Sequence, residues 1–299
     1  MKPLPSAPSR GYAASPELVA ESVVRAALLE DIGHGGDLTT EAIVDPQRRA
    51  TARIVARQRG VVAGLPFALI AFRLLDDGVE STVSVGEGEG VEPGAVVAEI
   101  SARARAILTG ERTALNLLCR LSGIATATRT MVDLVAGTRA KIADTRKTTP
   151  GLRALERYAV VRGGGSNHRF GLDDAVLIKD NHLVLAGSVR AAIAAARARV
   201  GHTIKIEVEV ENFDQLREAL EQPIDAVLLD NMTPSQLAEA VQIVGGRVVT
   251  EASGGVTQAN VAEIARTGVD VISVGWLTHS APALDFSLEM GGAIDAGVT

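Results

Sequence analysis

The sequence of 299 residues has a single cysteine, Cys119, few aromatic side chains (3%) and no excess of positive charge. One cysteine excludes an intrachain disulfide and a zinc site made of cysteines. Scarce aromatics argue against a surface that stacks nucleic-acid bases. The net charge of −6 argues against a nucleic-acid or anionic-membrane partner. The longest apolar run, residues 61–72, contains Gly64 and Pro66 and is too short to span a bilayer. These absences predict a soluble, cytoplasmic protein.

The residues that are abundant are apolar ones, at 46% of the chain, with alanine, valine, leucine and glycine prominent. This fraction predicts a sizeable core in which helices pack closely on sheets. The length fits one large α/β barrel or two domains. Residues 1–14 are rich in proline and serine and lack the apolar segment of a signal peptide, so we expect a flexible arm.

Residues 15–136 mix two patterns. A helical periodicity covers residues 15–31, and apolar residues alternate at a period of two from about residue 50 to residue 107, as in antiparallel strands. A helix at residues 66–77 lies between these strands. Residues 108–135 are helical again, with a break expected at Ser122 and Gly123. The region is therefore predicted to be a domain of antiparallel strands and helices.

From residue 137 onward, six apolar strands alternate with helical segments rich in alanine, glutamate and arginine. Repeated units of this kind predict parallel strands joined by right-handed crossovers. Six strands cannot be matched to the eight units of a complete barrel. The pattern therefore favours an open, incomplete α/β barrel, and a doubly wound sheet is the alternative.

Positive charge is concentrated in residues 144–169, although the whole chain is acidic. The basic residues there are Arg146, Lys147, Arg153, Arg157, Arg162, His168 and Arg169. A run of glycines in the same stretch lets the backbone approach a ligand closely, and guanidinium groups suit planar carboxylates and phosphates. The stretch predicts a site for a small polyanion. For Arg153 and Arg157, a solvated helix face is an equally good interpretation.

Charged residues and glycines gather where the six predicted strands end. The carboxyl ends of the strands form the active site in barrels of this kind. In chain order, these ends carry Arg146 and Lys147, Lys179, Glu209, Asp230, then Ser253, Gly254 and Gly255, and finally Gly275.

The strand that contains Glu209 has the clearest pattern. Lys205, Glu207 and Glu209 alternate with apolar residues, so they share one face, and we expect this row to point into the barrel. Glu209 and Asp230, on neighbouring strand ends, suit Mg²⁺ completed by substrate phosphates. The late glycines fall where barrels bind a phosphoryl group through loop amides. Together these groups predict a phosphorylated, metal-bound substrate and a second anion.

Nine motifs of this chain resemble those of the quinolinate phosphoribosyltransferase family. They are GERTALNLL (110–118), SGIAT (122–126), DTRKTTPGLR (144–153), YAV..GGG.NHR (158–169), LIKDNH (177–182), EVEVEN (207–212), LLDNM (228–232), EASGGV (251–256) and SVGWLTHSAPALDFSL (273–288). They cover nearly everything after the N-terminal arm. Arg157 is a departure, because it stands where the family often has lysine, and the arm itself is a second one.

The resemblance implies an N-terminal α/β sandwich domain, residues 15–136, joined by the C-terminal segment 277–299, and an open α/β barrel, residues 137–276, that carries the active site. It also implies a homodimer, with assembly up to a hexamer left open, and no nucleic-acid or membrane partner. Pairing would be head-to-tail, so that Arg112 of the partner subunit would enter the barrel mouth. Spacing alone makes Arg112 a solvent-facing residue of a helix.

For the site, the resemblance implies that quinolinate reacts with 5-phosphoribosyl 1-pyrophosphate to give nicotinate mononucleotide, pyrophosphate and CO₂. The residues that would bind quinolinate are Thr145, Arg146, His168, Arg169 and Lys179, together with Arg112 of the partner subunit. Those with catalytic roles would be Lys147, Lys179, Glu209 and Asp230, of which Glu209 and Asp230 would hold Mg²⁺. Those that bind the phosphoribosyl substrate would be Lys147, Ser253, Gly254, Gly255 and Gly275. Two alternatives are a related enzyme acting on another carboxylate and a non-catalytic protein that binds a phosphorylated ligand.

Overall fold

The computed structural model describes residues 16–294, and the predicted arm at residues 1–14 lies outside them. The chain divides into two compact units. The first contains the described residues up to Ala127, residues 149–164 and the residues from Ser280 onward, and the second contains Thr128–Thr148 and Gly165–His279. The domain limits expected from the sequence, at residues 136/137 and 276/277, stay a prediction. Among the described residues, no helix combines the length and the apolar character needed to cross a membrane.

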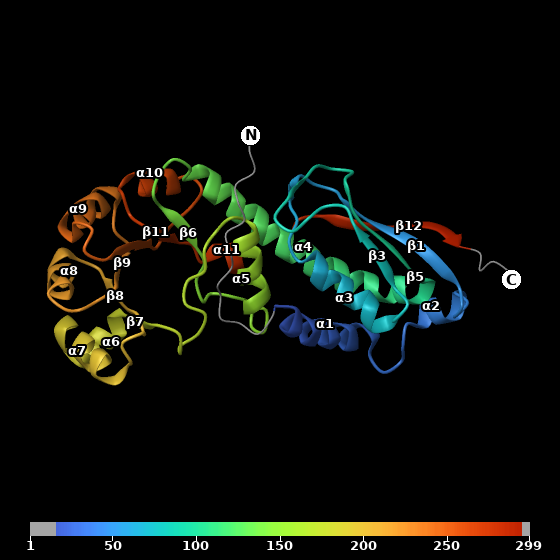
Figure 1. Cartoon of the computed structure of the whole chain (residues 1–299), viewed down its shortest axis with the longest axis horizontal. Coiled ribbons are helices and arrows are strands. Elements are labelled where there is room, and N and C mark those ends of the chain that lie inside the picture. The colour runs from blue at the N-terminus through green and yellow to red at the C-terminus, as the bar shows by residue number, and fades with distance from the viewer. Residues whose placement is uncertain (1–15, 295–299) are drawn as a thin grey trace. The chain divides into compact units, whose positions relative to one another are not determined.

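The first unit is built on a four-stranded antiparallel sheet in the order β12-β1-β5-β3. Its strands are β1 (Arg49–Ala56), β3 (Glu80–Val83), β5 (Val96–Arg103) and β12 (Phe286–Ile294). A short pair, β2 (Gly60–Val61) and β4 (Gly90–Val91), lies beside it. The helices are α1 (Pro16–Ile32), α2 (Leu38–Ile43), α3 (Leu65–Leu75), α4 (Ala104–Leu134) and α5 (Arg153–Arg162). Helices α3 and α4 lie along one face of the sheet (Figure 1). This confirms the predicted mixture of antiparallel strands and helices.

Helix α4 corrects two details of the sequence prediction. It begins at Ala104, where β5 ends at Arg103, so the strand pattern stops earlier than expected. It also runs continuously through Ser122 and Gly123, where we expected a break. The Ser122 hydroxyl bonds the backbone of Ala63, and a side chain at Gly123 would come within 2.1 Å of the Pro282 carbonyl oxygen. These two small residues therefore allow close packing on the helix instead of ending it.

The second unit is a six-stranded parallel sheet in the order β6-β11-β10-β9-β8-β7. Its strands are β6 (Lys141–Ala143), β7 (Val176–Ile178), β8 (Ile206–Val210), β9 (Ala226–Asp230), β10 (Val249–Ser253) and β11 (Val271–Ser273). Its helices are α6 (Asp180–Ala186), α7 (Val189–Arg199), α8 (Phe213–Leu220), α9 (Pro234–Val244), α10 (Val261–Arg266) and α11 (Trp276–His279).

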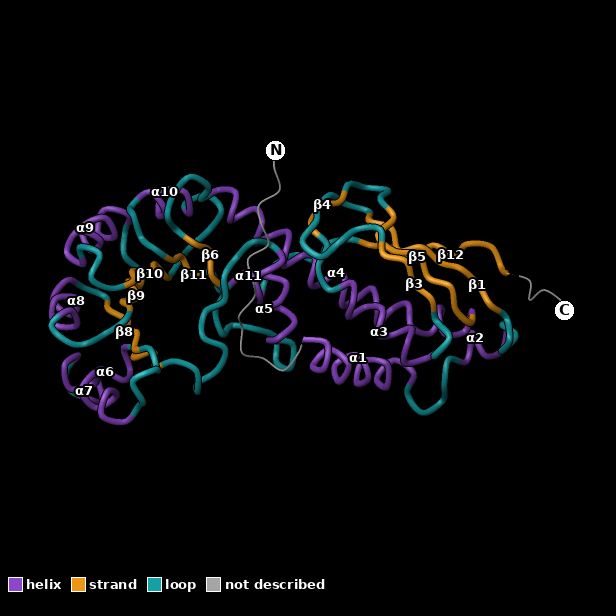
Figure 2. Tube along the Cα trace, viewed as in Figure 1, coloured by secondary structure: helices purple, strands orange, loops and turns teal. Residues whose placement is uncertain are grey.

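This arrangement is the predicted open barrel. Strands β7 to β11 follow one another in chain order, so the sheet has no point of reversal such as a doubly wound sheet has. Helices α7 to α10 lie outside the curved sheet (Figure 2). Within the described residues, the outer strands β6 and β7 do not pair with each other, which leaves the barrel incomplete.

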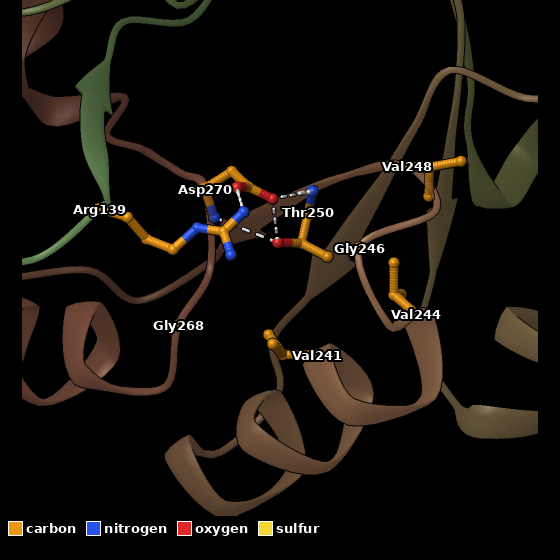
Figure 3. A pocket seen from close by; sticks show the side chains of 8 residues that line it. All are labelled: Arg139, Val241, Val244, Gly246, Val248, Thr250, Gly268 and Asp270. Carbon is orange, nitrogen blue, oxygen red and sulfur yellow. Dashed lines mark hydrogen bonds and ion pairs between the residues drawn. The ribbon is translucent and has the colours of Figure 1, made fainter.

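The amino ends of these parallel strands are held by aspartates. Asp270, just before β11, accepts hydrogen bonds from the backbone N–H (2.9 Å) and the hydroxyl (2.8 Å) of Thr250 in β10. It also pairs with Arg139, just before β6, at the rim of a small pocket (Figure 3). Burial alone would raise the pKa of the Asp270 carboxyl, but these donors outweigh burial and lower that pKa. The pair of strands is therefore locked together at this end.

Asp225, just before β9, has the same role one strand further along. It accepts the backbone N–H of Ile206 (2.8 Å) and the ammonium group of Lys205 (2.8 Å). The sequence prediction placed Lys205 in a row that points into the barrel, and this is wrong. Lys205 precedes β8, and its side chain is 75% exposed. The alternation of charged residues in the sequence therefore extends one residue beyond the amino end of β8. At that residue, Lys205, the side chain faces solvent instead of the barrel.

Candidate active site

The carboxyl ends of the six parallel strands meet at one edge of the second unit. Strand β6 leads into Thr145, Arg146 and Lys147, and β7 leads into Lys179. Glu209 lies near the end of β8, and Asp230, Ser253 and Gly275 lie at or just after the ends of β9, β10 and β11. With the exception of Arg112, every predicted site residue lies in this unit. Arg112 is an exposed residue of α4 in the first unit.

Lys179 and Glu209 form the central ion pair of this edge. The Lys179 ammonium donates to Glu209 Oε2 at 2.5 Å, and the Glu209 side chain is 9% exposed. Lys179 is placed by the start of α6, because its backbone N–H donates to His182 Nδ1 at 2.9 Å. The exposed part of the lysine leaves its charge accessible to a ligand. The pair thus joins a cation and a buried carboxylate on neighbouring strands.

Asp230 is close enough to this pair for both of its charges to shift the pKa of the Asp230 carboxyl. Burial raises the pKa of the Asp230 carboxyl, and the negative charge of Glu209 raises it further, while Lys179 and the hydroxyl of Ser253 oppose the shift. Two carboxylates that repel each other are the usual oxygen ligands of a divalent cation, which would relieve that repulsion. Glu209 and Asp230 have the chemistry to hold Mg²⁺, and the metal itself stays a prediction.

Glycines shape the backbone beyond the strand ends. Gly254 has φ +93°, and a Cβ there would lie 2.1 Å from Asn231 Oδ1, so a side chain is excluded. Asn231 is itself in the left-handed region (φ 53°), and its N–H donates to the carbonyl of Ser253 at 2.9 Å. Gly255 also has a positive φ, +61°. The two loops after β9 and β10 therefore approach each other more closely than side chains would permit.

The loop after β11 approaches the basic loop after β6. A Cβ at Gly275 would lie 2.9 Å from the Lys147 side chain and 3.5 Å from the Thr145 hydroxyl. The Thr145 hydroxyl accepts the Lys147 N–H at 3.1 Å, and the Lys147 carbonyl accepts the hydroxyl of Thr278 at 2.8 Å. These bonds hold the Lys147 backbone, and its side chain lies beside the open backbone of Gly275, which suits the binding of a phosphate group.

His168 lies below this surface, between two carboxylates. Its Nε2 atom is 3.2 Å from Glu207 Oε2 and 3.4 Å from Glu251 Oε1, and its backbone N–H donates to the fully buried Asp144 at 2.8 Å. Burial lowers the pKa of the His168 ring, but Glu207 and Glu251 outweigh burial and raise that pKa to about 10.

The contact at the other ring nitrogen, Nδ1, disfavours a second proton on the ring. The N–H of Arg169 donates to His168 Nδ1 at 2.7 Å, which requires Nδ1 to carry no proton. The carboxylates favour a second ring proton, whereas this contact favours the neutral ring with its proton on Nε2. In this conformation Nδ1 is an acceptor, and uptake of the second proton that the carboxylates favour would end the contact with Arg169.

Two arginines next to His168 complete the cationic surface. Burial and the positive charge of Arg146 lower the pKa of the Arg169 guanidinium, whose Nη1 donates to the Ala175 carbonyl at 2.9 Å. The Nε atom of Arg146 is buried, and among the described residues it has no hydrogen-bond partner. Two guanidinium groups that repel each other, one of them unsatisfied, are suited to an anion between them.

The sequence prediction missed some residues of this edge. Asp144 and Glu251 were part of quoted motifs but had no assigned role, and Glu207 was assigned only to a strand face. A period-two signal was available, since Glu251 precedes Ser253 by two positions as Glu207 precedes Glu209. The solvated-face interpretation of Arg157 is also wrong, because this residue is buried in α5 of the first unit.

Two family models match the chain. The N-terminal domain of quinolinate phosphoribosyl transferase matches residues 37–122, and the C-terminal domain of the same family matches residues 124–289. The chain belongs to this family. The resemblance noted in the sequence is thereby confirmed, and the matched ranges include every candidate residue of the site.

Relatives of known name agree. A probable nicotinate-nucleotide pyrophosphorylase [carboxylating] of Bacillus subtilis is 46% identical over 262 residues, which are 88% of this chain and 90% of the relative. Quinolinate phosphoribosyltransferase [decarboxylating] 1b of Nicotiana tabacum is 38% identical, over 93% of this chain and 84% of the relative. The solved nicotinate-nucleotide pyrophosphorylase of Francisella tularensis superposes with a TM-score of 0.89 at 38% identity, over 93% and 98% of the two chains.

Proposed function

We propose that this protein is a phosphoribosyltransferase that joins quinolinate to 5-phosphoribosyl 1-pyrophosphate and releases CO₂, forming nicotinate mononucleotide and pyrophosphate. The names of its relatives support this reaction. The observation that carries it is the meeting of a lysine–carboxylate pair, Lys179 and Glu209, with a group of buried or half-buried arginines at one sheet edge. Such a site suits a substrate with two carboxylates and a second, phosphorylated substrate.

The dicarboxylate would be bound by Arg146, Arg169 and Lys179. The pair of guanidiniums offers planar donors for one carboxylate, and the half-exposed ammonium of Lys179 offers a point charge for the other. The sequence resemblance adds Thr145, His168 and Arg112 of the partner subunit to this set. In this proposal the protein is a homodimer, and the exposed Arg112 of each subunit serves the site of the other.

The phosphoribosyl substrate would lie along the glycine-rich loops. Ser253, Gly254, Gly255 and Gly275 would present backbone N–H groups to its 5′-phosphate, and Lys147 would stabilise the departing pyrophosphate. Glu209 and Asp230 would hold Mg²⁺, which neutralises charge on the pyrophosphate when it is bound. This assignment gives each of the unusual backbone conformations a function.

The chemistry follows from positioning and charge. The ring nitrogen of quinolinate forms a bond to the ribose carbon while the bond from that carbon to pyrophosphate breaks. The ring nitrogen then carries a positive charge, and the ring accepts the electron pair left when the adjacent carboxylate departs as CO₂. A proton takes the place of that carboxylate. Fixed charges that match the developing charges supply most of the acceleration, and no general base is required for the transfer step.

The test is to mix the purified protein with quinolinate, phosphoribosyl pyrophosphate and Mg²⁺ and to follow CO₂ and nicotinate mononucleotide together. Both products should form at equal rates, and only when all three components are present. If neither forms although phosphoribosyl pyrophosphate binds, the protein acts on another carboxylate, and a panel of carboxylates identifies it. Binding without turnover of any carboxylate, and without need of Mg²⁺, would instead indicate a non-catalytic binding protein.

A further inference from the structure

Glu207 and Glu251 belong to neither set of proposed ligand contacts, although both contact His168, which is in the quinolinate set. Glu207 and Glu251 come from β8 and β10, and their side chains are 13% and 6% exposed. Burial raises the pKa of the Glu207 carboxyl, and the charge of Glu251 raises it further, whereas His168 opposes the shift. Glu251 Oε1 has no hydrogen-bond partner within the part of the chain that the structure describes. Two buried acids in one place are unfavourable for stability, so their presence calls for a functional reason.

The cluster fixes the orientation of the His168 ring. Glu207 and Glu251 lie on either side of Nε2, the Arg169 N–H donates to Nδ1, and Asp144 accepts the backbone N–H of His168. Both ring nitrogens are thus engaged within the protein. The ring is held at both nitrogens and the His168 backbone is held by Asp144, while the Nδ1 contact holds the backbone of the next residue, Arg169.

Arg169 is the link from this cluster to the ligand surface. Its guanidinium is fixed at one end by the Ala175 carbonyl and lies in the field of Arg146. Glu207 is also among the charges that act on it. A guanidinium held near another of the same charge stays in place only if the surrounding structure holds it there. The His168 ring holds the Arg169 backbone through Nδ1, and the negative charge of Glu207 acts on the guanidinium.

We propose that Glu207 and Glu251 are positioning residues: they hold the His168 ring, and through it Arg169, in the geometry that receives a carboxylate of the substrate. The proposal rests on the proposed function for the identity of that substrate. It assigns a role to two acids that an anionic ligand would not contact directly. It also makes His168 a support of the carboxylate site in addition to its predicted contact.

A metal ion is the rival explanation for the same three side chains. Their ligand atoms all lie within 4.8 Å of one another, and one histidine with two carboxylates is a possible ligand set. The contact on Nδ1 argues against it. Because Nδ1 accepts the N–H of Arg169, the ring proton lies on Nε2, the atom that a metal would have to bind. In this conformation Nε2 is therefore not available to a metal ion.

Substitution of Glu251 by glutamine distinguishes a positioning role from a simple charge effect, because the two change the affinity for an anion in opposite directions. Removal of a negative charge near a cationic site strengthens the binding of an anion by Coulomb's law. Loss of the support of His168 weakens it instead. Partners that orient a binding residue typically contribute about 10- to 100-fold in affinity or activity. We therefore expect Glu251→Gln to bind quinolinate at least about tenfold more weakly than wild type.

The experiment uses the full-length protein and measures the Kd of quinolinate by calorimetry and the KM of each substrate by steady-state kinetics. Glu263→Gln, at an exposed position of α10, is the matched control and should behave as wild type. In Glu251→Gln the Kd and KM of quinolinate should rise, while the KM of phosphoribosyl pyrophosphate should not change. Adding Glu251→Gln to His168→Ala should cause no further loss, because Glu251 acts through the ring.

Three results would overturn the proposal. If Glu251→Gln binds quinolinate as tightly as wild type or more tightly, Glu251 affects binding only through its charge and has no positioning role. An equal rise in both KM values together with a lower Tm would indicate a purely structural role. Binding of Zn²⁺ by wild type that Glu251→Gln abolishes would indicate a metal site. Failure of the proposed function is a separate result, because wild type itself would then neither bind quinolinate nor turn it over.

Discussion

The two ends of the parallel sheet treat their carboxylates in opposite ways. At the amino ends, Asp225 and Asp270 accept several hydrogen bonds, and these donors lower the pKa of both carboxyls in spite of burial. At the carboxyl end of β9, burial and the negative charge of Glu209 raise the pKa of Asp230. Deeper in the sheet, at the second residue of β8, burial and the charge of Glu251 raise the pKa of Glu207 in the same way. One end is electrostatically satisfied, and the other is not.

The difference identifies the end of the sheet that carries function. Satisfied aspartates join neighbouring strands and stabilise the fold. Repelling carboxylates and an arginine Nε atom without a hydrogen-bond partner among the described residues reduce stability, and a ligand of the opposite charge removes that penalty. The following variants test this contrast by making matched changes at the two ends.

The largest effect is expected from a pair of lysines. Lys179 pairs with Glu209 at the carboxyl end, and Lys205 pairs with Asp225 at the amino end. Lys179→Ala should reduce kcat by about a hundred- to a thousand-fold, because a fixed charge that contacts the substrate is lost. Lys205→Ala should keep kcat within about twofold, since an exposed ion pair contributes little. Steady-state kinetics on both variants measure this, and wild-type turnover by Lys179→Ala would contradict the assignment of the site.

A pair of glycines should show the next largest effect. Gly254 (φ +93°) and Gly246 (φ +74°) both have left-handed backbone, but only at Gly254 would a Cβ meet Asn231, at 2.1 Å. Gly254→Ala should lower kcat/KM for phosphoribosyl pyrophosphate by about tenfold or more, because the strain and the clash together are on the order of 1–3 kcal/mol. Gly246→Ala should lower only the Tm. If both variants show the same kinetics, the loop after β10 does not bind the phosphorylated substrate.

At the amino end, Asp270→Ala should reduce stability without changing activity. It leaves the N–H of Thr250 without its acceptor, which costs about 1–3 kcal/mol of unfolding free energy. Because the folded-state pKa lies below the ordinary value of 3.8 for an aspartate, the stabilisation is present above that pH and is lost as the pH falls through the folded-state pKa. Urea unfolding at pH 7 and at about pH 3 should therefore show a smaller difference from wild type in acid.

The smallest effect on stability has the opposite sign. Asp230→Asn removes a charge whose ionised form is disfavoured by burial and by Glu209. The Tm at neutral pH should rise by about 1–2 °C, a small value because solvent screens this half-exposed group, while activity is lost. Since the pKa of Asp230 is raised in the folded state, the gain in Tm should disappear as the pH falls below the ordinary value of 3.8 for an aspartate. A lower Tm, as expected for Asp270→Asn, would remove the contrast between the two ends.

Much of the fold was predictable from local patterns. Period-two alternation and helical spacing depend on neighbours in the sequence, so they located the antiparallel strands, the six parallel strands and the helices between them. Position at a strand end was also enough to predict where Lys179, Glu209 and Asp230 lie. The errors came at places where tertiary packing determines the structure. Gly123 lies inside a continuous helix and allows Pro282 to approach it closely, and Lys205 lies before the strand, outside the barrel.

The sequence by itself determined which residues could form strands, helices and a charged strand edge. The tertiary structure alone decided that His168 lies between Glu207 and Glu251, and that the glycine loops meet Asn231 and Lys147. These contacts join residues far apart in the chain, and they depend on strand order and register. Local periodicity contains no information about the register between strands. The register decides which buried charges become neighbours, so their pairing is known only from the assembled sheet.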